Sequence, residues 1–233
     1  MINQKPVKIA VFGSAEKTEK LTYREKRLAE ALGYYLGDIF GDKIEILTGA
    51  CTGVPLIVGV QARNYGIKVI GYSGEISLQE HLGNHNYASP KYFDELKFLD
   101  SEKRVLNGLA ERSLSMIREG DAFVYLGGRT GTLLEYLMAF DGSDKPMYVL
   151  RGSGGIVDRI QKLRIQKERK AGQLYETESA FDLARRLDKD FGICKFENDP
   201  DILVVHPMSQ TSWIQYAYLD RPPSSYKKVI VRD

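Results

Sequence analysis

A glycine-rich turn at residues 127–132 carries the strongest chemical signal in the sequence. It reads Gly-Gly-Arg-Thr-Gly-Thr, follows the apolar run Ala122–Leu126, and leads into a predicted helix that starts at Leu133. Backbone amides of such a turn, aligned with the N-terminus of a helix, bind anions. An arginine and two threonine hydroxyls add donors that suit a phosphate. The turn therefore predicts a phosphate-binding loop with five candidate ligands: Gly128, Arg129, Thr130, Gly131 and Thr132.

The same turn also has a purely structural interpretation. Thr132-Leu133-Leu134-Glu135 matches the capping-box pattern, in which threonine and glutamate satisfy the first free amides of a helix. Such a cap contributes about 1 kcal/mol and needs no ligand. It does not explain the glycines at 127, 128 and 131, which favour a backbone kept bare for close approach. We take phosphate binding as the leading interpretation and the capping box as the alternative.

Arg112 is the second candidate for chemistry. It shares one face of a predicted helix with three apolar side chains, Val105, Leu109 and Met116. These offsets turn the arginine toward the rest of the protein, where a desolvated guanidinium requires an anionic partner. It could instead extend to the domain edge or pair with Glu111 or Glu119. Because Glu135 lies on the next strand–helix unit, beside the phosphate loop, we expect Arg112 and Glu135 to face a ligand.

Three further glycine turns follow apolar runs elsewhere in the chain. They are Gly13-Ser14-Ala15, Thr48-Gly49-Ala50-Cys51-Thr52-Gly53 and Gly152-Ser153-Gly154-Gly155. Open parallel sheets bind ligands outside the carboxyl ends of their strands, where such turns lie. Four residues of these turns are predicted to bind the same ligand as the loop at 127–132: Gly13, Ser14, Gly49 and Gly53.

The elements that position these turns follow a strand–helix alternation. Five near-continuous apolar runs, typical of strands covered on both faces, are Val7–Gly13, Lys43–Gly49, Lys68–Gly74, Asp121–Gly128 and Lys145–Gly152. Helical periodicity lies between them, at Leu21–Phe40, Val54–Tyr65, Glu102–Arg118 and Gly131–Phe140. This order predicts an α/β fold, a three-layer Rossmann-like parallel sheet flanked by helices on both faces.

Three segments depart from this alternation. Glu75–Asp100 is predicted to be a long irregular loop, of the kind that often forms lids or binding loops. Two more helical patterns follow the fifth strand, at Ile156–Lys170 and Ser179–Phe191. Beyond them, strand-like pieces at Ile202–Val205 and Lys228–Val231 could extend the sheet or cross to a partner subunit. We predict one nucleotide-binding domain over residues 1–195 and an extension over 196–233, packed on that domain or on a partner.

Composition excludes several classes of protein. The 233 residues carry a formal charge of +2, too balanced to favour nucleic-acid binding. No apolar run approaches membrane-spanning length, and no apolar signal core follows the first residues. Cys51 and Cys194 are too few for a disulfide framework, which favours a reducing, cytoplasmic location.

His81 and His85 are predicted to be solvent-facing loop residues, so no metal site is expected. The chain also lacks GxGxxG and GxxxxGK[ST], which disfavours dehydrogenases and P-loop NTPases.

Taken together, these motifs resemble the LOG family of nucleoside 5′-monophosphate phosphoribohydrolases. The resemblance lies in Glu111-Arg112, Asp121-Ala-Phe-Val, and Leu126-Gly-Gly-Arg-Thr-Gly-Thr-Leu-Leu-Glu135, and it covers roughly residues 7–152. It implies that the Gly-Thr turn holds a 5′-phosphate while Arg112 and Glu135 act catalytically at the N-glycosidic bond. It also implies a homodimer, and no cofactor is expected.

Three positions depart from the pattern of that family. Gly127 replaces its proline, Arg129 replaces its second glycine, and Ser113 replaces the lysine after the arginine. Arg129 could strengthen phosphate binding or fill the pocket. The leading hypothesis is hydrolysis of an AMP-like nucleotide to free base and ribose 5-phosphate. A nucleotide sensor without turnover is the alternative, and a scaffold with a vestigial pocket is the third.

Overall fold

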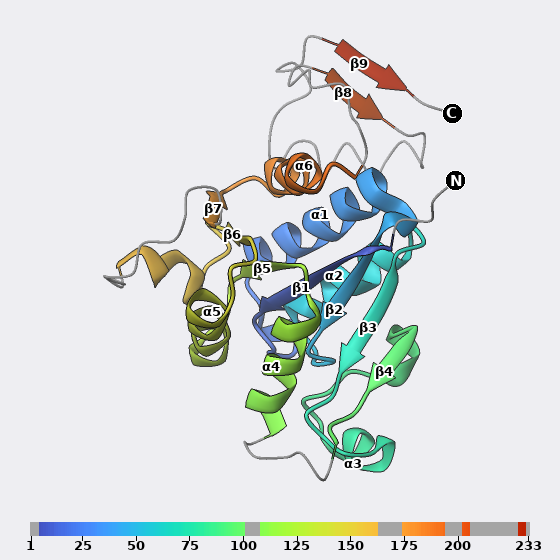
Figure 1. Ribbon diagram of the computed structural model, residues 1–233, viewed down its shortest axis with the longest axis vertical. Coiled ribbons are helices and arrows are strands. Elements are labelled where there is room, and N and C mark those ends of the chain that lie inside the picture. Colours follow the sequence, from blue (N-terminus) through green and yellow to red (C-terminus); the bar gives the residue numbers. More distant parts are fainter. Residues whose placement is uncertain (1–4, 101–107, 163–173, 194–201, 206–227, 232–233) are drawn as a thin grey trace.

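A computed structural model describes residues 5–100, 108–162, 174–193, 202–205 and 228–231 of the chain. Its centre is a seven-stranded, all-parallel sheet in the order β4-β3-β2-β1-β5-β6-β7 (Figure 1). The strands are β1 (Val7–Gly13), β2 (Ile44–Thr48), β3 (Lys68–Tyr72), β4 (Glu95–Lys97), β5 (Ala122–Leu126), β6 (Met147–Leu150) and β7 (Leu174–Thr177). β5 and β6 are buried along their whole length, and β1, β2 and β3 are buried along most of theirs, as their near-continuous apolar runs predict.

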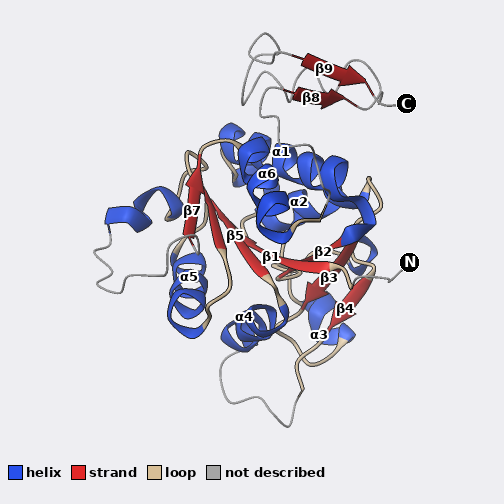
Figure 2. Cartoon of the chain, turned by 45° about the horizontal axis from the view of Figure 1, so that its top comes forward, coloured by secondary structure: helices blue, strands red, loops and turns tan. Residues whose placement is uncertain are grey.

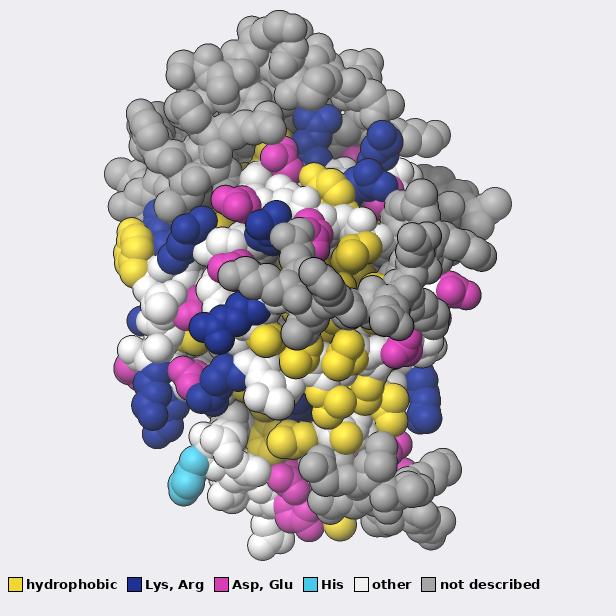
Figure 3. Space-filling view, turned by 90° about the vertical axis from the view of Figure 1, so that its left-hand side faces the viewer, with side chains coloured by type: hydrophobic (Ala, Val, Ile, Leu, Met, Phe, Trp, Pro, Cys, Tyr) yellow, Lys and Arg dark blue, Asp and Glu magenta, His cyan; other side chains and the backbone are white. Residues whose placement is uncertain are grey.

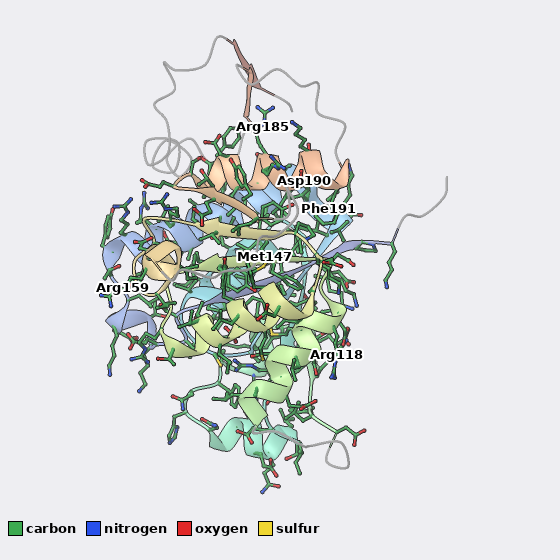
Figure 4. The ribbon with its side chains drawn as sticks, turned by 60° about the vertical axis from the view of Figure 1, so that its left-hand side comes forward. Arg118, Met147, Arg159, Arg185, Asp190 and Phe191 are labelled. Atoms are coloured by element: carbon green, nitrogen blue, oxygen red, sulfur yellow. The ribbon has the colours of Figure 1, made fainter. Side chains whose placement is uncertain are left out.

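Helices cover both faces of the sheet, which confirms the predicted three-layer α/β architecture (Figure 2). One layer contains α1 (Tyr23–Phe40), α2 (Val54–Arg63) and α6 (Ala180–Phe191). The opposite layer contains α4 (Gly108–Glu119) and α5 (Thr130–Gly142). Figure 4 shows the three layers with α6, marked by Arg185 and Asp190, on one side, Met147 in the sheet, and Arg118 on the other side. Each layer buries its own apolar core against the sheet.

The order of the strands reverses between β1 and β5. Strands β2, β3 and β4 extend from one side of β1, while β5, β6 and β7 extend from the other. Val11 pairs with Thr48 of β2 on one side and with Val124 of β5 on the other. The carboxyl ends of β1 and β5 therefore flank a topological switch point, where parallel sheets of this kind bind ligands. The predicted turns at residues 13–15 and 127–132 both lie there.

Two edge strands were missing from the sequence prediction. β4 lies inside Glu75–Asp100, which is not one irregular loop, because it also contains α3 (Leu78–Gly83) and a 3-10 turn, η3 (Pro90–Tyr92). β7 lies between the two helical patterns that follow β6. Both strands are three or four half-buried residues long, too short and too polar to show an apolar run.

Two of the predicted helices lie partly outside the described residues. The helix expected over Glu102–Arg118 is described from Gly108, because residues 101–107 lie outside the described part. The pattern at Ile156–Lys170 is a 3-10 helix, η5 (Val157–Lys162), and residues 163–173 are likewise outside. Short 3-10 turns also occur at η1 (Thr18–Lys20) and η2 (Gly41–Lys43). Among the described helices, none combines the length and the apolar character needed to cross a bilayer.

The two strand-like pieces near the C-terminus are strands, and they pair with each other. β8 (Ile202–Val205) and β9 (Lys228–Val231) form a parallel two-stranded sheet separate from the large one. They therefore do not extend the edge of the main sheet. The division of the chain near residue 195 stays a prediction.

Candidate functional site

The loop after β5 adopts a backbone that only glycine accepts readily. Gly127 and Gly128 have φ values of 62° and 86°, in the left-handed region. A Cβ atom on Gly128 would also overlap the side chain of Thr132. Helix α5 begins directly after this sharp turn. Its N-cap residue, Arg129, makes no side-chain capping hydrogen bond. The first amides of α5 have no partner within the helix, so they remain available as anion donors at the pocket.

The capping-box alternative is wrong. α5 begins at Thr130, so Thr132 lies inside the first turn of the helix and does not precede it. The Glu135 carboxylate is directed to a neighbouring helix, where it accepts hydrogen bonds from Ser113 and Arg112. The residue that the pattern assigned to a helix cap is therefore part of a buried polar cluster.

The two glycine amides of the loop already have partners within the protein. Gly127 N–H donates to Ser153 Oγ at 2.8 Å, and Gly128 N–H donates to Ser14 Oγ at 2.7 Å. Ser14 in turn donates to the Glu25 carboxylate at 2.9 Å. This chain of hydrogen bonds locks the loop after β5 to the loop after β1. Gly128 therefore shapes the loop, and its amide is not free to bind a phosphate.

Arg112 and Glu135 form a buried ion pair between α4 and α5. Both residues are 8% exposed, and Arg112 Nη2 lies 3.4 Å from Glu135 Oε1. Ser113 Oγ donates to the same carboxylate oxygen at 2.8 Å. The other possible partners of Arg112 are engaged elsewhere, Glu111 with Arg118 and Glu119 with two lysines, Lys8 and Lys97. The structure thus pairs Arg112 with Glu135, and not with Glu111 or Glu119 as the alternative interpretation had it.

The end of β2 completes the surroundings of Arg112. Its Nη1 donates to the Gly49 carbonyl at 3.1 Å and to Cys51 Sγ at 3.0 Å. A Cβ on Gly49 would lie 2.9 Å from the Arg112 Cζ atom, so glycine makes room for the guanidinium. Among the described residues, Arg112 Nε is a buried nitrogen with no hydrogen-bond partner. Gly53 has a similar packing role, since a Cβ there would overlap the Ser14 carbonyl oxygen.

Burial dominates the electrostatics of this cluster. It raises the pKa of Glu135 above the ordinary carboxyl value, although Arg112 and the hydrogen bond from Ser113 act in the opposite direction. Burial also raises the pKa of the Cys51 thiol, and Arg112 again opposes it. For Arg112, burial lowers the pKa, but Cys51 and Glu135 outweigh it, so the net pKa is raised and the guanidinium stays charged. A carboxyl group whose pKa is displaced in this way is typical of catalytic sites.

A cavity of about 600 Å³ opens over this cluster at the carboxyl ends of the strands. Seven of the predicted site residues line it: Gly13, Ser14, Arg112, Arg129, Gly131, Thr132 and Glu135. Four do not, namely Gly49, Gly53, Gly128 and Thr130. The side chain of Arg129 is 76% exposed and pairs with Glu16 at 2.6 Å, so it lies at the rim without filling the cavity.

The sequence analysis missed one wall of this cavity. Cys51 and Leu109 line it, together with five residues from the segment after β3: Gly74, Glu75, Asn84, Asn86 and Tyr87. The prediction of a binding loop over Glu75–Asp100 pointed to this segment without selecting any residue. Its excess of asparagine and aromatic residues was the available signal.

The histidine prediction was half wrong. His85 is exposed, but His81 is 1% exposed and lies on α3 with both ring nitrogens engaged, by Ser73 Oγ at 3.0 Å and the Ala88 carbonyl at 2.9 Å. Its ring stacks on that of Tyr87. Within the described ranges, no group of three or more histidine, cysteine, aspartate or glutamate side chains is arranged to hold a metal ion.

Comparison with known proteins decides the family. The model of the SLOG cluster4 family matches residues 6–183, well over half of the chain and all the elements that form the cavity. The chain belongs to the SLOG cluster4 family. This confirms the resemblance to LOG-like proteins of Rossmann-like fold. The comparison with curated proteins finds no match.

Solved structures share the fold. The protein TM1055 superposes with a TM-score of 0.62 at 24% identity, over 79% of this chain and 99% of the other. A molybdenum cofactor binding protein from the phototrophic bacterium Rippkaea orientalis gives a TM-score of 0.58 at 19% identity, over 81% and 99%. DNA processing protein A from Streptococcus pneumoniae gives 0.52 at 15% identity, over 77% and 61%. At these identities the likeness concerns the fold alone, and a shared fold does not imply a shared function.

Proposed function

We propose that this SLOG protein is a nucleoside 5′-monophosphate phosphoribohydrolase that releases the base from a purine nucleotide. The observation that carries the proposal is the Glu135 carboxylate at the cavity wall. Its Oε1 is held by Ser113 and Arg112, which leaves Oε2 for a substrate or a water molecule. A preorganised carboxylate of this kind can stabilise positive charge as it develops.

The phosphate would bind at the β1–β5 end of the cavity. Gly131 and Thr132, in the first turn of α5, line the cavity, and the first amides of a helix have no acceptor within it, so they would serve as phosphate donors there. Arg129 supplies a mobile positive charge at the rim, where a phosphate would compete with Glu16 for the guanidinium. Binding energy from this group, remote from the reacting carbon, would hold the ribose over Glu135.

The reaction needs only water as co-reactant. Departure of the base breaks the bond between its nitrogen and ribose C1′ and leaves positive charge on the sugar, as in glycoside hydrolysis. Ionised Glu135 would stabilise this charge and accept a proton from the attacking water, whose oxygen then bonds to C1′. Glu135 would then give this proton to the nitrogen of the base, which left with the bonding electron pair, so that the carboxylate is regenerated and the products are free base and ribose 5-phosphate. Arg112 would keep Glu135 oriented and its charge compensated.

Release of free base from purine nucleoside 5′-monophosphates, followed by chromatography, tests the proposal. Glu135→Gln keeps the shape of the side chain but removes the charge and the proton acceptor, so we expect kcat to fall by at least about 100-fold. Glu111→Gln is the matched control, since Glu111 pairs with Arg118 and does not line the cavity. Absence of base release from every common mononucleotide would contradict the proposal.

Binding of a nucleotide without turnover is the second candidate. Ser113 in place of the family's lysine favours it, because a neutral hydroxyl supports an ionised carboxylate less strongly than an ammonium does. The fold is also shared with a protein named for binding the molybdenum cofactor. Calorimetry that detects nucleotide binding, with no product by chromatography, would select this function.

A homodimer and a cytoplasmic location belong to the same proposal. Hydrophobic side chains gather on the face of the molecule shown in Figure 3, and α5 presents an exposed Leu134. The nearly balanced formal charge of +2 does not favour a nucleic-acid partner. Sedimentation equilibrium of the full chain tests the dimer, and a monomer at all micromolar concentrations would contradict it.

A further inference from the structure

The wall of the cavity opposite the phosphate end is a polar surface built from the segment after β3. Glu75, Asn84 and Asn86 line it, with Leu109 of α4 nearby at 56% exposure. This surface lies outside the loop and the ion pair described above. In the hydrolysis proposed here, it would face the part of the substrate that is neither phosphate nor ribose.

The segment is held firmly against the end of β2. Thr52 N–H donates to the Asn86 carbonyl at 3.2 Å, and Ala88 N–H donates to the Ala50 carbonyl at 2.8 Å. An isolated antiparallel bridge joins Cys51 to Tyr87 between these two bonds. The asparagines therefore keep a fixed position relative to the ion pair, as a recognition surface requires.

Hydrogen bonds within this wall determine which groups remain for a ligand. Asn84 Nδ2 donates to Glu75 Oε1 at 3.0 Å, and Asn84 Oδ1 accepts from Asn86 N–H at 3.1 Å. The carboxamide is thereby oriented, and its oxygen is in use. The wall offers a ligand the carboxylate of Glu75 and the second N–H of Asn84. A complementary ligand therefore has hydrogen-bond donors opposite the Glu75 carboxylate and an acceptor opposite the Asn84 amide.

The spacing of the strands fits a mononucleotide. The phosphate end lies at β1 and β5, and this wall lies at the end of β3, two strands away from β1. Neighbouring strands are about 4.8 Å apart, so the two ends are separated by roughly 10 Å. A ribose fits between them, over Glu135, which places a base against the wall.

We propose that this wall selects guanine over adenine, an inference that rests on the nucleotide function proposed above. Guanine presents N1–H and its 2-amino group to one carboxylate, and its O6 accepts from an amide N–H. Adenine would place the lone pair of N1 against the Glu75 carboxylate and leave it unpaired. A bidentate contact of this kind discriminates between bases by about 10- to 100-fold. Hypoxanthine, which lacks the 2-amino group, is expected to fall between the two.

Calorimetry and kinetics on the full chain test this inference with GMP, IMP and AMP. We expect GMP to bind and react about 10- to 100-fold better than AMP. Glu75→Gln should remove most of this preference by weakening the binding of GMP, because one carboxylate oxygen is replaced by an NH2 group, which donates hydrogen bonds and cannot accept one from guanine. Glu80→Gln is the matched control on the same segment, because Glu80 is exposed and does not line the cavity. Thermal unfolding checks that both variants are folded.

Equal affinities for GMP and AMP, or a Glu75→Gln variant that weakens both equally, would overturn the inference. Ribose 5-phosphate, which has no base, shows whether a variant has lost phosphate binding. Its affinity should be the same in wild type and Glu75→Gln, so a change in GMP binding alone reports on the base. Tighter binding of GMP without base release would refute the proposed hydrolysis and support the base assignment. Base release at equal rates from all three nucleotides would support the proposed hydrolysis and refute the preference for guanine.

Discussion

Replacement of Ser113 by alanine should move the acid limb of the pH–rate profile to higher pH. Ser113 Oγ lies 2.8 Å from Glu135 Oε1, and its hydrogen bond stabilises the ionised carboxylate. Burial already holds the pKa of Glu135 above the ordinary carboxyl value. Since the proposed reaction needs the ionised form, activity falls as the pH drops through this pKa. Loss of the hydrogen bond raises the pKa further, so the variant loses activity at a pH where the wild type still works.

The geometry of Ser113 sets the size of this shift. A hydrogen bond to a charged group contributes about 1.5–3 kcal/mol, and one pKa unit corresponds to about 1.4 kcal/mol, which gives a range of about one to two units. Ser113 Oγ also lies 2.9 Å from the Leu109 carbonyl, so its proton has another acceptor when Glu135 is neutral. This lowers the net gain from ionisation, and we expect a shift of about one unit.

The assay is kcat/KM for base release as a function of pH, which reports the pKa of the free enzyme. Ser115→Ala is the matched control, because Ser115 Oγ makes the same kind of bond to a helix carbonyl, that of Glu111 at 3.0 Å, and does not line the cavity. Ser113→Thr should restore the wild-type profile. An unshifted acid limb in Ser113→Ala, or an equal shift in Ser115→Ala, would refute the reasoning.

Three further changes test the walls of the site. Ser14→Ala removes the partner of the Gly128 amide and of Glu25, so the free energy of unfolding in urea should fall by about 1–3 kcal/mol, and an unchanged value would contradict the network. Gly128→Ala, at a φ of 86°, should abolish binding of ribose 5-phosphate, while Gly142→Ala at the other end of α5 should not. Arg129→Gln should lower the affinity for ribose 5-phosphate only a few-fold and reduce the salt dependence of its binding, because the Arg129 side chain is exposed.

Local sequence patterns were sufficient to predict the three layers of this protein. Near-continuous apolar runs predicted the five inner strands, because a strand covered on both faces is apolar at most of its positions. The placement of Arg112 on the inner side of α4 also followed from spacing along one helix. The edge strands β4 and β7 did not, since their half-buried residues carry no such run.

The roles of the glycines depended on the tertiary structure. A glycine in a turn indicates that something approaches the backbone closely, but the pattern does not say what. At Gly49 it is the guanidinium of Arg112, at Gly53 the Ser14 carbonyl, and at Gly128 the side chain of Thr132. Each is part of the chain itself, so the predicted ligand contacts became packing contacts.

For the polar groups of the site, the sequence predicted the residue types, whereas the tertiary structure decided their hydrogen-bond partners. The residue types at positions 112 and 135 predicted a buried charge and a carboxylate near a loop, because both properties are local. The partners of Glu135 are a serine 22 positions away on another helix and its neighbour Arg112, and the wall at residues 84–87 is held by the loop after β2, more than 30 positions earlier. Contacts over such separations leave no periodicity in the sequence, so only the folded chain reveals which of the available donors each acceptor takes.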